Sequence, residues 1–274
     1  MAACLVLGYI LTLGLVPLGR AMLARWGHLR PNYAGRPVPT SMGIPLVASA
    51  TIASGAVMAL LPDPDASWAL AGPCLIVVNA AMLAGVVDDL FGSSESRGIT
   101  GHATALFKKG IVTTGLLKAG VILVSAAIAI RTAAPALPAP ALALDALVVA
   151  LAANLSNLLD LRPGRAAKAY LVGATALAVA TGLRAPALVP VGLAGAILAE
   201  IRDDLAERGM LGDAGSNPLG AALGYWLALT TPVAARVAAL LALCLVHVYA
   251  ERHSITAAIE RNPFLRFLDA LGRR

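Results

Sequence analysis

Long apolar stretches recur along almost the whole chain and are separated by short polar segments. A helix of about 20 mostly apolar residues crosses the roughly 30 Å hydrocarbon layer of a bilayer. The pattern therefore predicts an all-α bundle of about nine transmembrane helices that forms a single domain over residues 1–274. The expected helices cover residues 3–19, 43–61, 69–87, 112–130, 141–159, 166–181, 185–201, 217–231 and 233–250.

Three of these ranges, 166–181, 185–201 and 217–231, are short for a full crossing. One pair of them could be tilted, broken or re-entrant. The final segment, SITAAIERNPFLRFLDALGRR, mixes apolar and basic residues and predicts an amphipathic helix that lies on the membrane surface. The chain begins MAACLVLGYILTLGLVPLG without a basic lead, which favours a retained first helix over a cleaved secretion signal.

The composition strengthens the membrane interpretation. Hydrophobic residues make up 59% of the chain and charged residues 13%, whereas an ordinary soluble domain has roughly 45 to 50% and about 25%. The three cysteines lie inside apolar stretches without paired spacing. The sequence therefore excludes a water-soluble domain of useful size, and it indicates neither a disulfide framework nor a zinc knuckle.

The basic residues predict the orientation. With an outside N-terminus and nine crossings, every Lys and Arg falls on the cytoplasmic side except Lys118, Arg131, Arg184 and Arg236. The net charge of +6 follows from this topology and from contact with an anionic inner leaflet. It therefore requires no nucleic-acid partner.

The acidic residues share that side, although carboxylates have little influence on orientation. Only Asp63, Asp65 and Asp145 fall elsewhere, which predicts a site at the cytoplasmic face that uses carboxylates. The segment GVVDDLFG places Asp88 and Asp89 side by side at the end of the third expected helix. Two adjacent carboxylates repel each other unless a cation lies nearby, and a solvated helix end is the ordinary alternative.

A polar stripe enters the membrane in NLSNLLDLRPGR. Asn154, Asn157 and Asp160 are spaced by three residues and therefore share one helical face. Interhelical hydrogen bonding would explain the two asparagines alone. Arg162 and Arg165 follow directly, and their guanidinium groups match phosphate oxygens, which favours an anion site.

Two further segments carry polar groups to the same face. In MLGDAGSNPLG, Asp213 lies in a glycine-rich turn before a helix start, where backbone amides attract phosphate. An ordinary turn with Ser216 or Asn217 as the N-cap is the alternative. In FKKGIVTTGLLKAG, Lys118 lies inside the fourth expected helix on the side of Thr114. Snorkelling would explain this lysine, but an ionisable residue inside a span is a functional candidate.

These segments open on one membrane face at similar depth according to the expected topology. Asp88, Asp89, Asp160 and Asp213 are hard oxygen donors of the type that Mg²⁺ prefers. Lys118 supplies complementary positive charge. The four histidines, which show no zinc spacing, receive no role: His28, His102, His247 and His253.

The order of five segments resembles one enzyme family. GRPVPTSMGIP, GVVDDLFG, TTGLLKAG, NLSNLLD and GDAGSNPLG follow one another as in the polyprenyl-phosphate N-acetylhexosamine-1-phosphate transferases, which include the phospho-MurNAc-pentapeptide translocase and the GlcNAc-1-phosphate transferases. The resemblance implies Mg²⁺-dependent transfer of a sugar 1-phosphate from a UDP-sugar to polyprenyl phosphate. UMP would be released at the cytoplasmic face of the inner membrane, and the product would start a cell-envelope glycan. Mn²⁺ could replace Mg²⁺ as the metal ion. The protein could also form a homodimer.

The resemblance and the chemistry together assign roles to the candidate residues. Asp89 and Asp213 are expected to bind Mg²⁺, and Asp88 is expected to position or deprotonate the lipid phosphate. Lys118 is expected to contact phosphates. Further substrate-binding residues are expected in two groups, with Arg162 and Arg165 on phosphates and Asn154, Asn157 and Asp160 around the nucleotide.

Three departures and three rival hypotheses accompany the resemblance. Pro163 replaces the family's second acid after the asparagines, the usual last crossing is missing, and the absence of a His-rich loop argues against a pentapeptide-carrying substrate. One rival is a transporter or flippase for an anionic lipid or solute. Another is a phosphotransferase acting on CDP-alcohols, which would require aspartates that 166–181 lacks. The third is an inactive family relative.

Overall fold

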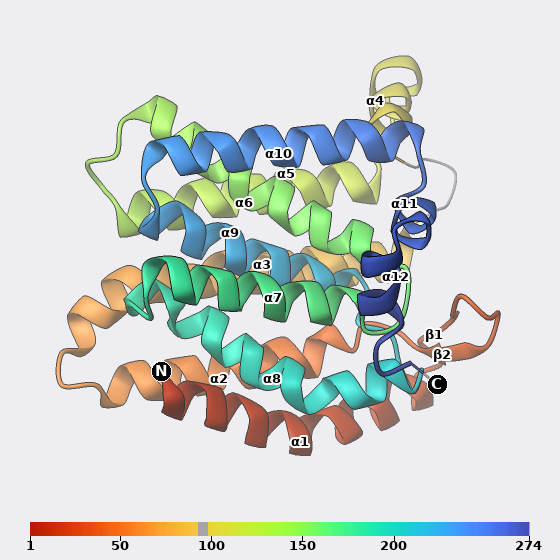
Figure 1. Cartoon of the computed structure of the whole chain (residues 1–274), viewed down its shortest axis with the longest axis horizontal. Coiled ribbons are helices and arrows are strands. Elements are labelled where there is room, and N and C mark those ends of the chain that lie inside the picture. The colour runs from red at the N-terminus through yellow and green to blue at the C-terminus, as the bar shows by residue number, and fades with distance from the viewer. Residues whose placement is uncertain (93–97, 274) are drawn as a thin grey trace.

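A bundle of long helices that run along a common axis makes up most of the protein (Figure 1). The computed structural model describes residues 1–92 and 98–273, with the backbone alone for 99, 100, 102 and 103, so Arg97 and Arg274 of the expected basic face lie outside the described residues. Each expected apolar range corresponds to one long helix. These helices are α1 (Ala2–Arg25), α2 (Gly43–Leu60), α3 (Pro64–Phe91), α5 (Thr114–Ala133), α6 (Ala139–Leu159), α7 (Arg165–Thr181), α8 (Leu188–Leu205), α9 (Asp213–Thr230) and α10 (Val233–Arg252).

Seven helices in the described part of the chain are long and apolar enough to cross a membrane. They are α1, α2, α3, α5, α6, α10 and the segment Ala185–Leu205, in which a short 3-10 turn, Ala185–Ala187, leads into α8. The structure therefore confirms the prediction of an all-α multi-pass membrane bundle. The seven helices do not include α7 and α9, which correspond to two of the ranges that were expected to be short for a full crossing.

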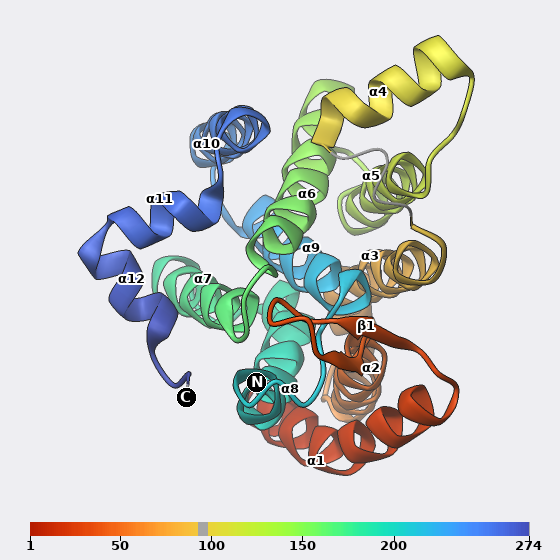
Figure 2. The ribbon, with the colours of Figure 1, turned by 90° about the vertical axis from the view of Figure 1, so that its right-hand side faces the viewer.

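Helix α9 lies at the centre of the bundle, between α3, α6 and α7 (Figure 2). Its first half is buried without interruption from Ala214 to Ala222. A helix that faces other helices instead of lipid needs less apolar surface of its own, and α9 is less hydrophobic than α3 and α6. The position of α9 carries its N-terminal residues into contact with α2, α3, α5 and α6.

Glycines allow α9 to approach α2 and α3 at backbone distance. A methyl group added at Gly43 of α2 would lie 2.1 Å from the backbone nitrogen of Gly215. One added at Gly85 of α3 would lie 2.3 Å from the carbonyl oxygen of Asp213. Both distances are too short for any larger side chain, so the two glycines set how closely α9 lies against its neighbours.

Several short elements cover one end of the bundle. A two-stranded antiparallel hairpin, β1 (Leu29–Pro31) and β2 (Pro37–Pro39), and the helix α4 (Gly98–Lys109) lie there and were not predicted from the sequence. The expected surface helix is present as two helices, α11 (Ile255–Arg261) and α12 (Pro263–Ala270). The break has a local cause, because Asn262 caps α12 through its side chain and Pro263 occupies the first turn, where its missing N–H is tolerated. Both helices run across the bundle end (Figure 2).

An ion-pair cluster anchors α12 to α7. The carboxylate of Asp269 accepts hydrogen bonds from Arg165 at 2.7 and 3.0 Å and from Arg273 at 2.7 and 2.9 Å. Burial alone would raise the pKa of Asp269, but the hydrogen bonds from these arginines outweigh it and hold the pKa at about 2. On the outer side of α12, Phe264 and Phe267 are exposed, as an amphipathic surface helix requires.

A second ion pair lies among the long helices, away from the covered end. Asp145 of α6 is fully buried, and one of its oxygens accepts a hydrogen bond from Arg236 of α10 at 2.6 Å. Helix α10 packs chiefly on α6. The pair therefore ties α10 to the bundle at the start of that helix.

The Asp269 cluster predicts an acid-sensitive attachment of α12. Because the folded-state pKa of Asp269 lies below the usual value near 4, its contribution to stability is complete above pH 4. That contribution is lost as the pH falls from about 4 to about 2. Hydrogen exchange of residues 263–270 should accelerate over this window in the wild type, whereas Asp269→Asn should exchange rapidly at every pH. An acceleration centred near neutral pH would contradict the assignment.

The Asp145 pair predicts a large loss of stability when one partner is removed. Arg236→Leu leaves a buried carboxylate without its partner, which costs about 3 to 5 kcal/mol in comparable sites. The thermal unfolding temperature of the protein in detergent should fall clearly. Arg184→Leu, at an exposed arginine, serves as the matched control and should change little. Equal unfolding temperatures for the two variants would show that the pair contributes nothing.

Candidate functional site

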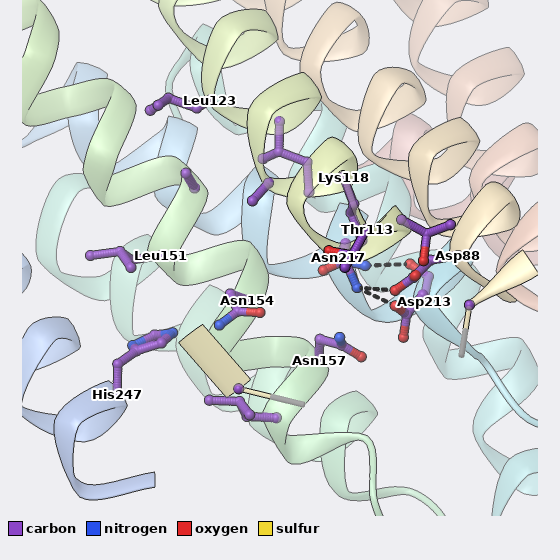
Figure 3. Close-up of a pocket in the computed structure, with 18 of the residues that line it drawn as sticks. Asp88, Thr113, Lys118, Leu123, Leu151, Asn154, Asn157, Asp213, Asn217 and His247 are labelled. Atoms are coloured by element: carbon purple, nitrogen blue, oxygen red, sulfur yellow. Dashed lines mark hydrogen bonds and ion pairs between the residues drawn. The ribbon is translucent and has the colours of Figure 1, made fainter. Parts of the chain in front are cut away.

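A pocket of about 910 Å³ opens where α3, α5, α6, α9 and α10 meet (Figure 3). Six of the expected site residues line the pocket: Asp88, Asp89, Lys118, Asn154, Asn157 and Asp213. These residues come from four helices that lie far apart in the sequence. The structure thus brings together most of the polar groups that the sequence placed at one membrane face.

Asp88, Lys118 and Asp213 form the charged centre of the pocket. The Nζ atom of Lys118 lies 2.7 Å from Oδ2 of Asp88, and it also donates a hydrogen bond to Oδ2 of Asp213. Thr114, one helical turn before Lys118, hydrogen bonds with Asp88 as well. Lys118 is only 7% exposed, so the ammonium group neutralises two carboxylates away from bulk water. These three side chains can hold a further charged group only by exchanging partners.

Asp89 points away from this centre and caps α9. Successive residues on a helix are turned by about 100°, so Asp88 and Asp89 face different neighbours. The carboxylate of Asp89 accepts hydrogen bonds from the backbone N–H groups of Asp213 at 3.0 Å and Ala214 at 3.2 Å. The hydroxyl of Ser41 donates a third at 2.6 Å. Asp89 therefore satisfies the unpaired amides and complements the positive end of the α9 dipole.

Helix α9 begins earlier than the sequence indicated. Its first residue is Asp213, so Ser216 and Asn217 lie within its first turns and neither is its N-cap. The hydroxyl of Ser216 instead lies 3.2 Å from Oδ1 of Asn157, which links α9 to α6. The asparagine stripe thus supports helix packing at Asn157 while Asn154 lines the pocket.

Asp160 lies just beyond the end of α6 and outside the residues that line the pocket. Burial, together with the nearby carboxylates of Asp204, Asp213 and Asp89, raises the pKa of Asp160 well above its usual value. The backbone of Gly212 partly offsets this rise. Asp160 is therefore placed beside the turn that leads into α9.

The two expected phosphate-binding arginines are not brought to the pocket. Arg165 is engaged with Asp269 and with the hydroxyl of Thr256, at 3.0 Å. The guanidinium group of Arg162 stacks over the ring of Tyr33, with 4.7 Å to its centroid. Both arginines hold the elements that cover the bundle end, in an arrangement that no local sequence pattern indicates.

The polar lining residues that the sequence analysis missed include Arg30, His247 and Glu251. Arg30 of the hairpin reaches the pocket and donates hydrogen bonds to the carbonyl groups of Asp89 at 3.1 Å and Leu90 at 3.2 Å. Nothing local distinguishes it from the other arginines of that segment. His247 of α10 also lines the pocket. The sequence did contain a signal for His247, because a polar residue inside an apolar helix is a functional candidate.

The opposite side of the pocket is apolar. Ile122 and Leu123 of α5 and Leu147 and Leu151 of α6 line this side. The pocket therefore joins a charged centre to a hydrophobic wall between two long helices. Such a surface suits a ligand that carries both a charged group and an apolar chain.

The charged centre offers two carboxylates, those of Asp88 and Asp213, that could hold a metal ion. Among the described residues, no group of three or more His, Cys, Asp or Glu side chains could hold a metal ion. Mg²⁺ is usually held by one or two carboxylates together with substrate phosphates and water. Asp88 and Asp213 already share one cationic group, whereas the oxygens of Asp89 are engaged by α9 and Ser41. The geometry thus favours Asp88 over Asp89 as the partner of Asp213.

The two adjacent aspartates should respond differently to mutation. Asp89→Ala removes the cap of α9 and should cost about 1 to 2 kcal/mol of stability. Asp88→Ala is the matched control, because Lys118 keeps Asp213 as a partner and the loss should be smaller. Chemical or thermal unfolding of both variants in one detergent tests this order. A larger loss for Asp88→Ala would contradict the division of roles.

No protein-family model matches the sequence, and a search of curated proteins finds no match either. The interpretation of the pocket therefore depends on its residues, their contacts and the order of the motifs.

Proposed function

We propose that the protein transfers a sugar 1-phosphate from a UDP-sugar, of the UDP-N-acetylhexosamine type, to polyprenyl phosphate and releases UMP. One observation carries the proposal. Asp88, Lys118 and Asp213, from three helices, meet in a single pocket that also offers amide groups and an apolar wall. The five motifs occur in the order typical of the enzymes that perform this reaction. The product would start a cell-envelope glycan.

The orientation is part of the proposal. We place the N-terminus outside, all nine long helices across the inner membrane, and the pocket at the cytoplasmic face. The distribution of Lys and Arg supports this arrangement, because the segments at the pocket end are rich in both. The amphipathic α12 lies at the same end, where an anionic leaflet would attract its basic neighbours.

The reaction moves one phosphorus from one oxygen to another. A non-bridging oxygen of the lipid phosphate attacks the sugar-bearing phosphorus. The bond from that phosphorus to the bridging oxygen breaks, and UMP leaves with the electron pair of that bond. The charge that develops on the leaving oxygen requires a nearby cation. Lys118 supplies one, and Asp88 and Asp213 hold its ammonium group in place.

A divalent ion would act at the same centre. Asp88 and Asp213 would hold it, and the ion would neutralise the diphosphate when bound. Lys118 would then release one carboxylate and turn toward a substrate phosphate, since a lysine stem is flexible. Arg30 lies at the pocket, where it adds a second positive charge for the nucleotide phosphates.

The apolar wall supports a lipid acceptor. A polyprenyl chain can lie along α5 and α6, against Leu123, Leu147 and Leu151, while its phosphate reaches the charged centre. A soluble acceptor would have no use for such a surface. The wall therefore favours a membrane-bound acceptor over a water-soluble one.

The decisive experiment measures UMP release. Purified protein with polyprenyl phosphate, Mg²⁺ and several UDP-sugars should release UMP, and Asp213→Asn should reduce the rate by about 100-fold or more. Asp65→Asn is the matched control, because this aspartate is exposed in the first turn of α3, outside the pocket. It should keep the wild-type rate.

Two results would contradict the proposal. A protein that moves a labelled lipid or solute between membrane leaflets without forming UMP would be a transporter. A protein that binds UDP-sugars but never turns them over would be an inactive relative of the transferases. UMP release that depends on the lipid phosphate excludes both.

A further inference from the structure

His247 is a buried polar residue with an unused nitrogen. It lies in α10, one of the most apolar helices, and is 4% exposed. Its Nδ1 atom lies 2.7 Å from the carbonyl oxygen of Leu243, one turn earlier in the helix. Its Nε2 atom is buried and has no hydrogen-bond partner among the described residues. Such a group costs stability unless a ligand satisfies it.

The bond to Leu243 determines what Nε2 can do. A carbonyl oxygen only accepts hydrogen bonds, so Nδ1 must carry the proton. In a neutral imidazole, Nε2 then has a free lone pair and acts as an acceptor. A phosphate oxygen is also an acceptor, so the neutral ring does not pair with a phosphate. The group that matches Nε2 is an uncharged O–H or N–H donor.

The position of His247 separates it from the charged centre. Its ring points into the pocket toward Asn154 of α6, and the Asp88, Lys118 and Asp213 cluster lies beyond Asn157 (Figure 3). The pocket therefore has one part centred on the ion pairs of Lys118 and another part around His247, where Glu251, one turn later in α10, is also a lining residue. A ligand that fills both must join a phosphate group to a neutral polar group.

We propose that His247 and Asn154 form a subsite for an uncharged hydrogen-bond donor of the nucleotide sugar. This subsite rests on the proposed function and extends it, because His247 selects a part of the substrate that does not react. The donor is either a hydroxyl or amide N–H of the sugar or the N–H of the base. Both share the chemistry that Nε2 requires.

The test compares the binding of UDP and of UDP-N-acetylglucosamine by calorimetry, with Mg²⁺ present. His247→Phe keeps a flat ring and removes the acceptor, so it should weaken binding of the nucleotide sugar about five- to tenfold. A loss confined to the sugar nucleotide identifies the sugar as the donor, and an equal loss for UDP identifies the base. Unchanged affinity for both ligands overturns the proposal.

Two further variants sharpen this test. His247→Gln offers an amide oxygen that can accept the same hydrogen bond, and it should recover part of the lost affinity. His253→Phe is the matched control, because His253 is exposed near the end of α10, where it stacks on Tyr249. It should bind both ligands as the wild type does. An equal loss in His253→Phe would overturn the assignment to His247.

A measurement without ligand separates this proposal from the proposed function. If Nε2 is kept free for a ligand, His247→Phe removes an unpaired buried group and should raise the unfolding temperature of the ligand-free protein by about 2 to 4 °C. A fall would show that the ring is needed for packing and would overturn the subsite. Wild-type protein that binds neither nucleotide would refute the proposed function and the subsite together, whereas wild-type binding that His247→Phe leaves unchanged would overturn the subsite alone.

Discussion

The close packing of the α9 N-terminus against α3 is the constraint on which the rest of the site depends. Gly85 removes the side chain that would keep the two backbones apart, and the carboxylate of Asp89 closes the gap by binding the first amides of α9. Asp213 is the first residue of that helix. Its position beside Asp88 therefore follows from backbone contact and capping, before any attraction between charged side chains is considered.

The adjacent aspartates show how one sequence motif serves two purposes. The carboxylate oxygens of Asp89 accept hydrogen bonds at the start of α9, whereas Asp88 and Asp213 both accept hydrogen bonds from Lys118. Lys118 can stay buried because two partly exposed carboxylates of opposite sign balance its charge. Backbone contact fixes the centre on the side of α9, whereas Lys118 reaches it through a long stem.

The helices and their order could be predicted from the sequence, because an apolar segment in lipid has few alternatives to a helix. The meeting of Asp88, Lys118 and Asp213 followed from their shared depth at one membrane face. The direction in which each side chain points could not be predicted from the sequence, because it depends on which helix or loop lies opposite that side chain in the fold. Arg165 shows this limit, because a distant Asp269 engages the guanidinium group that local spacing assigned to phosphate. His247 was overlooked although a polar residue inside an apolar helix is a signal, because its lack of a partner at Nε2 is visible only when the residues around it are known.

The pair between Asp145 and Arg236 has a consequence for biosynthesis. The two residues are 91 positions apart, and α6 is synthesised long before α10. Until the later helix arrives, Asp145 has no arginine to neutralise it and remains costly in hydrocarbon. A nascent chain interrupted before residue 233 would keep that defect permanently. The last long helix thus completes the charge balance of α6, because only a chain that includes it can neutralise Asp145.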